Sequence, residues 1–249
     1  MSDTGLELYH GQASTCSKKV RLTLYEKGLA FRSHLLDLQK FEQHDPNYLK
    51  INPNGVVPTL IHNGRIILES SVIIEYLEDA FPATPLRSAD PAATAALRLW
   101  LRLSDLAYDA VSPRTWMVVN RDLMRDFSDE EREHVLARIP TPERRKRWRE
   151  VSAAGFPQSE LDAADQKMRT LLRRCEDALG KTPFLAGDAY SLADIAIIPF
   201  IVRIENLLRA LLADYPRTVE WYHRVRARPA FGKAIYFDDD PRAAGMVNI

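Results

Sequence analysis

The chain has 249 residues, of which 46% are hydrophobic and 27% charged, with 34 basic and 34 acidic side chains. This composition is typical of a globular protein, and the length fits one large domain or two ordinary ones. A formal net charge of zero provides no overall field that would attract nucleic acid or an anionic membrane, so we expect neither as a partner.

The N-terminal third of the chain is predicted to mix strands and helices. A helix between two strands at this spacing implies a right-handed parallel crossover. Asn63 and Gly64 separate two β-rich runs, and this dipeptide is the strongest short signal for a tight hairpin. In chain order we expect a strand at 6–9, a helix at 15–27, a strand at 31–36, an irregular link, hairpin strands at 56–61 and 65–68, and a helix at 70–81.

The remainder of the chain is predicted to be helical. A proline-containing linker over 81–91 leads into it, and Ser191 with Asp194 forms a capping-box signal at the start of a very apolar helix. Helices are expected at 92–112, within the charged stretch 128–160, at 160–179, at 195–212 and, singly or as a pair, at 216–236, before an irregular tail from 238. We therefore predict an α/β domain over 1–82 followed by an all-α domain over 91–249.

The two cysteines, Cys16 and Cys175, lie far apart and have no CxxC spacing. We expect neither a disulfide framework nor a zinc or other metal site, and a reducing compartment is the default. The first five residues carry neither the basic nor the apolar segment of a secretory signal, and no apolar run approaches the ~18 residues of a membrane span. These features predict a cytoplasmic protein.

Small hydroxyl and thiol side chains gather at the first strand-to-helix turn, where Ser14, Cys16 and Ser17 open the first helix. A helix N-terminus presents unpaired N–H groups and a partial positive charge, so it favours an anion such as a thiolate. The alternative is that Ser14 is only an N-cap and that Cys16 is a small core residue on an apolar stripe with Val20 and Leu24.

Val57-Pro58, at the start of the hairpin, is a candidate cis peptide bond. A cis bond here would turn the backbone N–H and C=O of Val57 outward, where they could pair with an extended peptide ligand. The alternative is an ordinary proline on an edge strand.

Glu69 and Ser70 stand at the last strand-to-helix junction. Ser70 and the helix end suit a carboxylate, while Glu69 suits an amine, so the pair fits the head group of an α-amino acid. The alternative is a plain N-cap with an acidic neighbour. The three motifs together indicate one ligand with an amino-acid head, a peptide middle and a thiol end.

On these motifs the chain resembles the cytosolic glutathione transferases, with a thioredoxin-like domain over residues 6–82 and a helical second domain. The turn 14–17 followed by Val20, Arg21 and Leu22 is similar to the serine-type signature, nearest the zeta class. Ser191–Asp194 matches the family's capping box. A finer resemblance, to bacterial β-etherase-type transferases and their fungal relatives, rests on residues 25–28, 40–44, 140–143, 148–149 and 155–158.

The resemblance implies glutathione as co-substrate and a role for each motif. Ser14 would donate a hydrogen bond to the glutathione sulfur, Val57 beside Pro58 would pair with the cysteinyl backbone, and Glu69 with Ser70 would hold the γ-glutamyl head. Gln43 and His44 align with positions that reach the glycyl carboxylate. Cys16, where the β-etherase turn is expected to have asparagine, would instead run thiol-transfer or reductase chemistry through a mixed disulfide. Ser17 is the third candidate.

The acceptor pocket is expected between the domains, where Trp100, Tyr108 and Trp116 are candidate substrate contacts or else ordinary packing residues. β-Etherase-type relatives cleave β-aryl ethers of lignin-derived aromatics, so a hydrophobic, aromatic electrophile is implied. The family usually forms homodimers, and the face of helix 92–105 that carries Arg98 and Arg102 with Leu97, Trp100 and Leu101 is the candidate interface. A non-catalytic binding module with a transferase fold is the remaining alternative.

Overall fold

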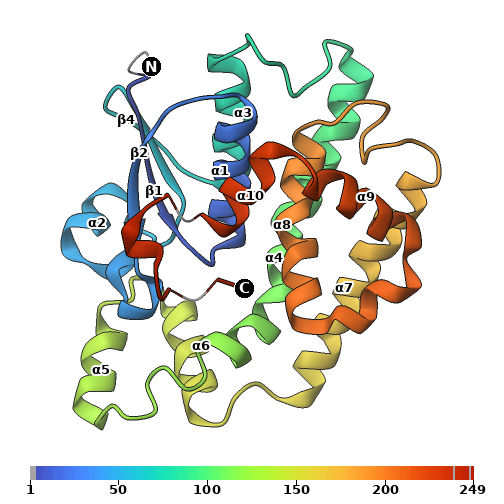
Figure 1. Ribbon diagram of the computed structural model, residues 1–249. Helices are drawn as coiled ribbons and strands as arrows, with labels where there is room; N and C mark the ends of the chain where they lie inside the picture. Colours follow the sequence, from blue (N-terminus) through green and yellow to red (C-terminus); the bar gives the residue numbers. More distant parts are fainter. Residues whose placement is uncertain (1–3, 238, 247) are drawn as a thin grey trace.

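The computed structural model describes residues 4–237, 239–246 and 248–249. An α/β part is followed by a helical part, and the chain then returns to the first part with its C-terminal segment (Figure 1). The predicted fold class is confirmed. Residues 1–3, on which the expected lack of a secretory signal partly rests, and residue 238, where the irregular tail was expected to begin, lie outside the described ranges.

The sheet has four strands in the order β2-β1-β3-β4, with β1 parallel to β2 and the other two pairs antiparallel. The parallel pair is joined through a helix, as predicted. Asn63 and Gly64 have φ values of 50° and 79°, the left-handed geometry that a two-residue hairpin needs. The strands are β1 (Leu6–Gly11), β2 (Arg32–Leu36), β3 (Thr59–His62) and β4 (Arg65–Ile67).

The helices of the α/β part are α1 (Thr15–Glu26), α2 (Pro46–Ile51) and α3 (Ser70–Ala80). Two 3₁₀ turns, η1 (Leu38–Lys40) and η2 (Glu42–His44), precede α2. This region was expected to be irregular. Asp45 supplies the start signal for α2, because its carboxylate accepts from the N–H of Asn47 and Pro46 occupies the first helical position.

The helical part contains α4 (Pro91–Val119), α5 (Asp129–Ala137), α6 (Pro142–Ala153), α7 (Gln158–Leu179), α8 (Leu192–Leu208), α9 (Pro216–Arg226) and α10 (Pro229–Tyr236), with 3₁₀ turns η3 (Arg209–Asp214) and η4 (Pro241–Ala243). Helix α4 continues past the predicted end at residue 112. Pro113 removes one backbone donor, but Trp116 on the next turn is buried and holds the extension against α6.

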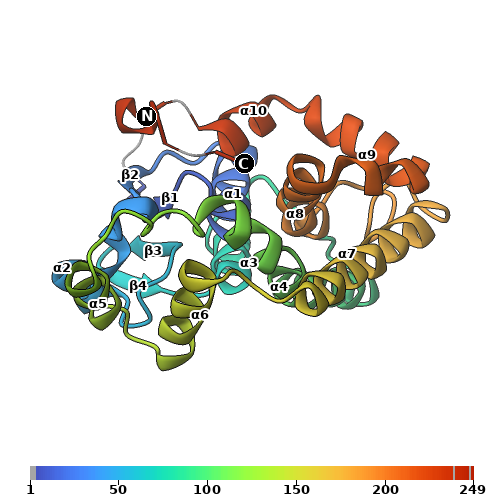
Figure 2. The ribbon, with the colours of Figure 1, turned by 90° about the horizontal axis from the view of Figure 1, so that it is seen from below.

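The main core joins the sheet to α1, α3, α4, α7 and α8. Leu97, Trp100 and Leu101 belong to it, so the apolar side chains expected on an exposed face of α4 point inward. A second core forms around Trp116, Trp148 and Phe156, and it includes Phe41 from the turn between η1 and η2. The second core therefore holds α5 and α6 beside the loop that leads into α2, as seen from below in Figure 2.

Helix α1 packs against α3, α8 and α10 and so connects the two parts of the chain. Arg21 is completely buried, and its Nε donates to the Ala234 carbonyl of α10 at 2.7 Å. Arg228 forms a bidentate ion pair with Glu26, at 2.7 and 2.8 Å. Among the residues that the structure places, no helix combines the length and the apolar character that crossing a membrane requires.

Candidate active site

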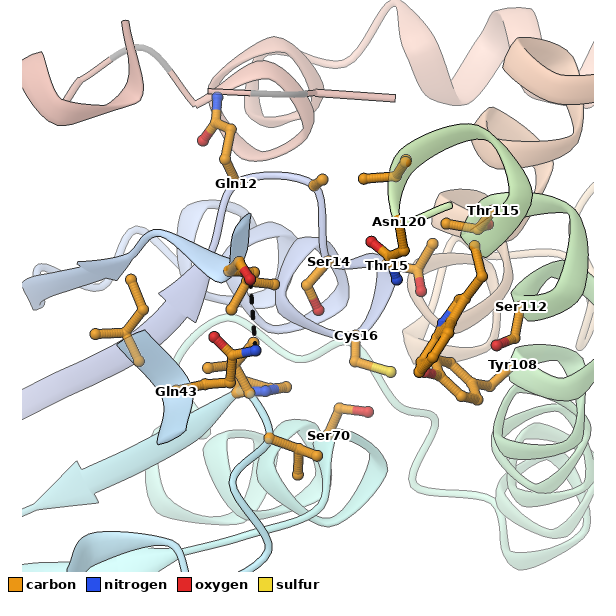
Figure 3. A pocket seen from close by; sticks show the side chains of 18 of the residues that line it. Gln12, Ser14, Thr15, Cys16, Gln43, Ser70, Tyr108, Ser112, Thr115 and Asn120 are labelled. Atoms are coloured by element: carbon orange, nitrogen blue, oxygen red, sulfur yellow. Dashed lines mark hydrogen bonds between the residues drawn. The ribbon is translucent and has the colours of Figure 1, made fainter. Parts of the chain in front are cut away.

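A cavity of about 380 Å³ lies between the α/β part and helices α4 and α6. One wall is made by the start of α1, the loop after β2, the loop before β3 and the start of α3. The opposite wall comes from α4, with Tyr108, Ser112 and Thr115 (Figure 3), from α6 and from Arg203 of α8. Nine of the residues singled out in the sequence line it: Ser14, Cys16, Gln43, Val57, Pro58, Glu69, Ser70, Tyr108 and Trp116.

Ser14 is the N-cap of α1, and its hydroxyl oxygen accepts from the Ser17 N–H at 3.2 Å. The hydroxyl proton of Ser14 is left to donate into the cavity. Ser17 is fully buried and its oxygen accepts from the Gly11 N–H at 3.2 Å, away from the cavity wall. The sequence-based suggestion of Ser17 as a catalytic candidate is therefore corrected, because its side chain is used to close the turn.

Cys16 is half-buried, and Figure 3 shows its thiol directed toward Tyr108 and Ser112 of α4. The apolar stripe of α1 does lie in the core at Val20 and Leu24. Cys16, the first residue of this stripe, faces the cavity instead, because α1 begins at the cavity wall. The view of Cys16 as a core residue is therefore wrong.

Buried cations surround the start of α1. Lys19 Nζ donates to Ser71 and Ser104 at 2.8 and 3.0 Å, and it lies 3.6 Å from an oxygen of Asp105. Burial lowers the pKa of Lys19, and it lowers the pKa of Arg203 to about 10, so Arg203 stays charged at neutral pH. The turn therefore provides a positive field that favours a thiolate.

The peptide bond between Val57 and Pro58 is cis, as predicted. Within the described residues the N–H and C=O of Val57 have no hydrogen-bond partner. The preceding carbonyl of Val56 accepts from the Tyr48 hydroxyl at 2.6 Å and from the Asn52 amide at 2.9 Å. Burial raises the pKa of Tyr48 to about 12, which keeps its hydroxyl a donor. Helix α2 thus fixes the loop with the backbone of Val57 free to pair with an extended ligand.

Glu69 has φ 66° and ψ 115°, a left-handed conformation that non-glycine residues rarely adopt. Such conformations are retained mainly at functional sites. The Glu69 carbonyl accepts from the Ile73 N–H at 2.8 Å, which starts α3 directly at the cavity wall. Ser70 and the N-terminus of α3 consequently face the cavity (Figure 3), and Glu69 also lines the cavity.

Gln43 and His44 have different environments. Gln43 lines the cavity, where its amide donates to the Leu38 carbonyl at 3.5 Å and its buried Oε1 has no partner among the described residues. His44 is completely buried beside the Phe41 ring and is absent from the cavity wall. Burial lowers the pKa of His44 to about 4, so the ring is neutral. The expectation that His44 contacts a ligand is therefore corrected.

On the opposite wall Tyr108 and Trp116 line the cavity, but Trp100 does not. Trp100 faces the main core because its position on α4 puts it on the side that meets the other helices. Among the described residues no three His, Cys, Asp or Glu side chains are grouped so that they could hold a metal ion.

Sequence reasoning missed several residues of the cavity wall: Gln12, Thr115, Asn120, Arg144, Trp148 and Arg203. Arg203 could have been noticed, because it is a lone cation in the middle of a very apolar helix. Arg144 and Trp148 belong to a charged stretch whose helical pattern gives no sign of which face meets the cavity.

The described residues form a mixed sheet with helices, followed by a helical bundle, and the turn that favours a thiolate lies on the cavity between the two parts. This combination is typical of the class of glutathione-dependent transferases. The family model for the glutathione S-transferase N-terminal domain matches residues 8–85, and that for the C-terminal domain matches residues 135–229. The chain belongs to the glutathione S-transferase family and is an enzyme of that family. The resemblance predicted from the sequence is thereby confirmed.

Protein LigF of Sphingobium sp. (strain NBRC 103272 / SYK-6) is 39% identical over 238 residues, which cover 90% of this chain and 91% of LigF. The crystal structure of beta-etherase LigF has a TM-score of 0.86 at 36% identity, covering 95% of this chain and 100% of that one. A tetrachloro-p-hydroquinone reductive dehalogenase of Sphingobium chlorophenolicum is 25% identical, covering 92% of this chain and 95% of the relative.

Proposed function

We propose that this enzyme activates the thiol of glutathione for attack on a hydrophobic aromatic electrophile, and that the electrophile is a β-aryl ether. One observation carries the proposal. A single cavity holds the Ser14 turn, the free backbone of Val57 and the Glu69–Ser70 junction on one wall, and the aromatic rings of Tyr108 and Trp116 on the other. The similarity to LigF, which is named a beta-etherase, supports the ether as the acceptor.

The glutathione tripeptide would lie extended along the first wall. Its γ-glutamyl ammonium would meet Glu69, its α-carboxylate would meet Ser70 and the start of α3, and its cysteinyl backbone would pair with Val57. This arrangement brings the sulfur to the start of α1, within reach of the Ser14 hydroxyl. A free thiol has a pKa near ~8.5. Lowering it by roughly 2 units requires about 2.7 kcal/mol of preferential stabilisation, which one charge-assisted hydrogen bond and a helix N-terminus can supply.

The thiolate would attack the carbon that carries the aryloxy group. A carbon–sulfur bond forms, the carbon–oxygen bond breaks with its electron pair, and the aryloxide leaves and takes a proton from water. The products are a glutathione thioether and a phenol. Tyr108 and Trp116 would hold the aromatic rings against the sulfur.

The proposal is tested by incubating the protein with glutathione and a dimeric β-aryl ether, with mass spectrometry of the products. We expect one thioether and one phenol for each ether consumed. Glutathione alone should raise the thermal midpoint by an amount that grows with the logarithm of its excess over Kd. No shift and no calorimetric heat at millimolar glutathione would overturn the transferase function and favour a non-catalytic binding module.

A second candidate function is thiol transfer through Cys16. The observation that favours it is the position of the Cys16 thiol on the cavity wall, in the first turn of α1. In that case the Cys16 thiolate would attack the glutathionyl sulfur of a mixed disulfide, so that a Cys16–glutathione disulfide forms and the other partner leaves as a thiol. A second glutathione thiolate would then attack that disulfide, which regenerates Cys16 and gives oxidised glutathione. Turnover of a glutathione mixed disulfide that exceeds ether cleavage would favour this alternative.

We further propose that the enzyme works as a homodimer in the cytoplasm, with a glutathione domain over residues 1–82 and a substrate domain over 91–249. Cys16 and Cys175 are both free thiols, which is typical of a reducing compartment. The candidate interface is a set of exposed apolar side chains on α3 and α4, namely Val72, Leu99 and Leu106.

A further inference from the structure

Arg144, at the start of α6, is a cation on the cavity wall without an anionic partner. Within the described residues it forms no ion pair and no hydrogen bond, and its Nε is buried. Its guanidinium carbon lies 5.5 Å from the centre of the Trp116 ring. Arg147 and Arg149 of the same helix pair with Glu160 at 2.6 Å and with Glu133 at 2.9 Å. Arg145 likewise has a buried Nε without a partner among the described residues, but it does not line the cavity. Arg144 is therefore the unpaired arginine of α6 that faces the cavity.

A second unused donor lies on the same wall. The indole N–H of Trp148 is buried and has no partner among the described residues, although Trp148 lines the cavity. Trp148 packs on Trp116 with their ring centres 5.0 Å apart, so Trp116 touches both donor-bearing side chains. Leaving such donors unpaired in a buried site is costly unless a ligand pairs with them. An acceptor with negative charge fits both.

None of the described acidic residues that line the cavity pairs with Arg144. Asp37 pairs with Lys40 at 3.0 Å, and Asp105 lies 3.6 Å from Lys19. Glu69 stands at the start of α3 and is assigned to an ammonium. The cavity thus presents one carboxylate and one guanidinium for a ligand, together with the positive start of α3. A tripeptide with one ammonium and two carboxylates satisfies all three.

The segment before α6 lies close to the loop that carries Val57, and the two meet at Gly55. A Cβ on Gly55 would come within 3.1 Å of Pro140 and 2.9 Å of His44, so Gly55 allows the segment before α6 to contact the loop that carries Val57. His44 is neutral and buried, and Arg144 supplies the cation at this end of the cavity.

We infer that Arg144, assisted by the indole N–H of Trp148, forms a carboxylate subsite that the helical part contributes to glutathione binding, and that it takes the glycyl carboxylate. This inference rests on the proposed function. The γ-glutamyl end is held at Ser70 and the cysteinyl part at Val57. An extended tripeptide then continues past Gly55 toward Gln43 and α6. A carboxylate on the aromatic acceptor has the same chemistry, and the experiment separates the two sources.

The test compares Arg144→Gln with Arg145→Gln, a matched control that removes the same charge from the next residue of α6, which does not line the cavity. Calorimetry measures the Kd of glutathione and of γ-glutamylcysteine, which lacks the glycine. For Arg144→Gln we expect glutathione to bind roughly 10- to 100-fold more weakly, the effect of one lost charged hydrogen bond. Arg144→Gln should bind γ-glutamylcysteine as tightly as the wild type does. Arg145→Gln should bind both ligands as tightly as the wild type does. Arg144→Lys should recover part of the loss, and Trp148→Phe should cost only a few-fold.

Three results would overturn the glycyl assignment. Glutathione could bind Arg144→Gln as it binds the wild type, or both ligands could lose affinity equally, which would indicate a general structural effect. In the third, KM rises only for an acceptor that carries a carboxylate, and not for its methyl ester, while glutathione affinity is unchanged. That result assigns the subsite to the acceptor. A wild-type protein that binds no glutathione would instead overturn the proposed function itself.

Discussion

The guanidinium of Arg203 donates a hydrogen bond to the carbonyl oxygen of Ala13, 190 positions earlier in the sequence. The same side chain donates to the Thr115 hydroxyl of α4 at 2.9 Å and to the Ile249 main-chain oxygen at 3.2 Å. It is only 4% exposed. One residue of α8 therefore fixes the position of the Ser14 turn relative to α4 and to the C-terminal segment.

Replacing Arg203 by Met is expected to lower both stability and turnover. Met keeps most of the length and the packing but leaves the buried acceptors of Ala13 and Thr115 without a donor. We expect the free energy of unfolding to fall by about 2–3 kcal/mol, measured by urea denaturation, together with a lower kcat/KM. The control is Arg209→Met, at an exposed position of η3. Equal denaturation midpoints for Arg203→Met and the wild type would contradict this prediction.

Substitutions at Ser14 and Cys16 separate the two proposed chemistries. Ser14→Ala should reduce ether-cleaving turnover by roughly 10²-fold, which corresponds to about 2.7 kcal/mol. The pKa of bound glutathione, followed by thiolate absorbance, should rise in the same variant, while the Kd of glutathione changes little. Cys16→Ser should be mild in both respects. An inactive Cys16→Ser with a near wild-type Ser14→Ala would instead identify a cysteine-type thiol transferase. Ser17→Ala should affect mainly stability, since its oxygen accepts from the Gly11 N–H.

His44 predicts a specific loss of stability in acid. Burial lowers its pKa to about 4 in the folded protein, whereas an unfolded histidine titrates near ~6.5. Between these values the unfolded chain binds a proton that the folded chain does not, so stability falls as the pH falls from about 6.5 to about 4. We expect this group to account for about 2 to 3 kcal/mol of that loss.

The measurement is the free energy of unfolding against pH for the wild type and for His44→Gln. The difference between the two curves should be flat above pH ~7 and should shift in favour of the variant as the pH falls toward ~4. Parallel curves would show that His44 titrates alike in both states.

Asp194 is predicted to be a strong determinant of stability. Its carboxylate accepts from the Trp221 indole N–H at 2.8 Å, the Ser191 N–H at 2.9 Å and the Leu185 N–H at 3.1 Å. Asp194→Ala leaves these buried donors unpaired, and we expect a loss of about 3–4 kcal/mol. Chemical denaturation measures it, with the exposed Asp188→Ala as control. A loss below ~1 kcal/mol would show that water replaces the carboxylate.

The proposed dimer predicts that charged side chains on α4 will separate the protomers. Leu99 and Leu106 are 68% and 51% exposed and lie seven residues apart, on the same face of the helix. Leu99→Glu combined with Leu106→Glu should convert a dimer at micromolar concentration into a monomer by light scattering. Val118→Glu, farther along α4, should leave the dimer intact. A monomeric wild type would refute the dimer. Arg98, which was expected at this interface, pairs within the chain with Glu75 at 2.8 Å.

The features that depend only on neighbouring residues could be predicted from the sequence. The Asn63-Gly64 turn, the cis bond before Pro58, the N-cap at Ser14 and the capping box of Ser191 with Asp194 follow from local backbone preferences and short-range hydrogen bonds. Such preferences are decided within a few residues, so a single sequence is enough to predict them.

Which side chains reach the cavity depends on how the helices pack, and the sequence did not predict it. Trp100 and Trp116 lie on one helix, yet the first packs into the main core and the second lines the cavity. His44 was expected to meet the ligand but is buried under Phe41, while Arg144 and Arg203 reach the site from α6 and α8. Helical periodicity gives the faces of a helix but not the neighbour that each face meets. That choice depends on packing between segments more than 100 residues apart, such as Ala13 and Arg203.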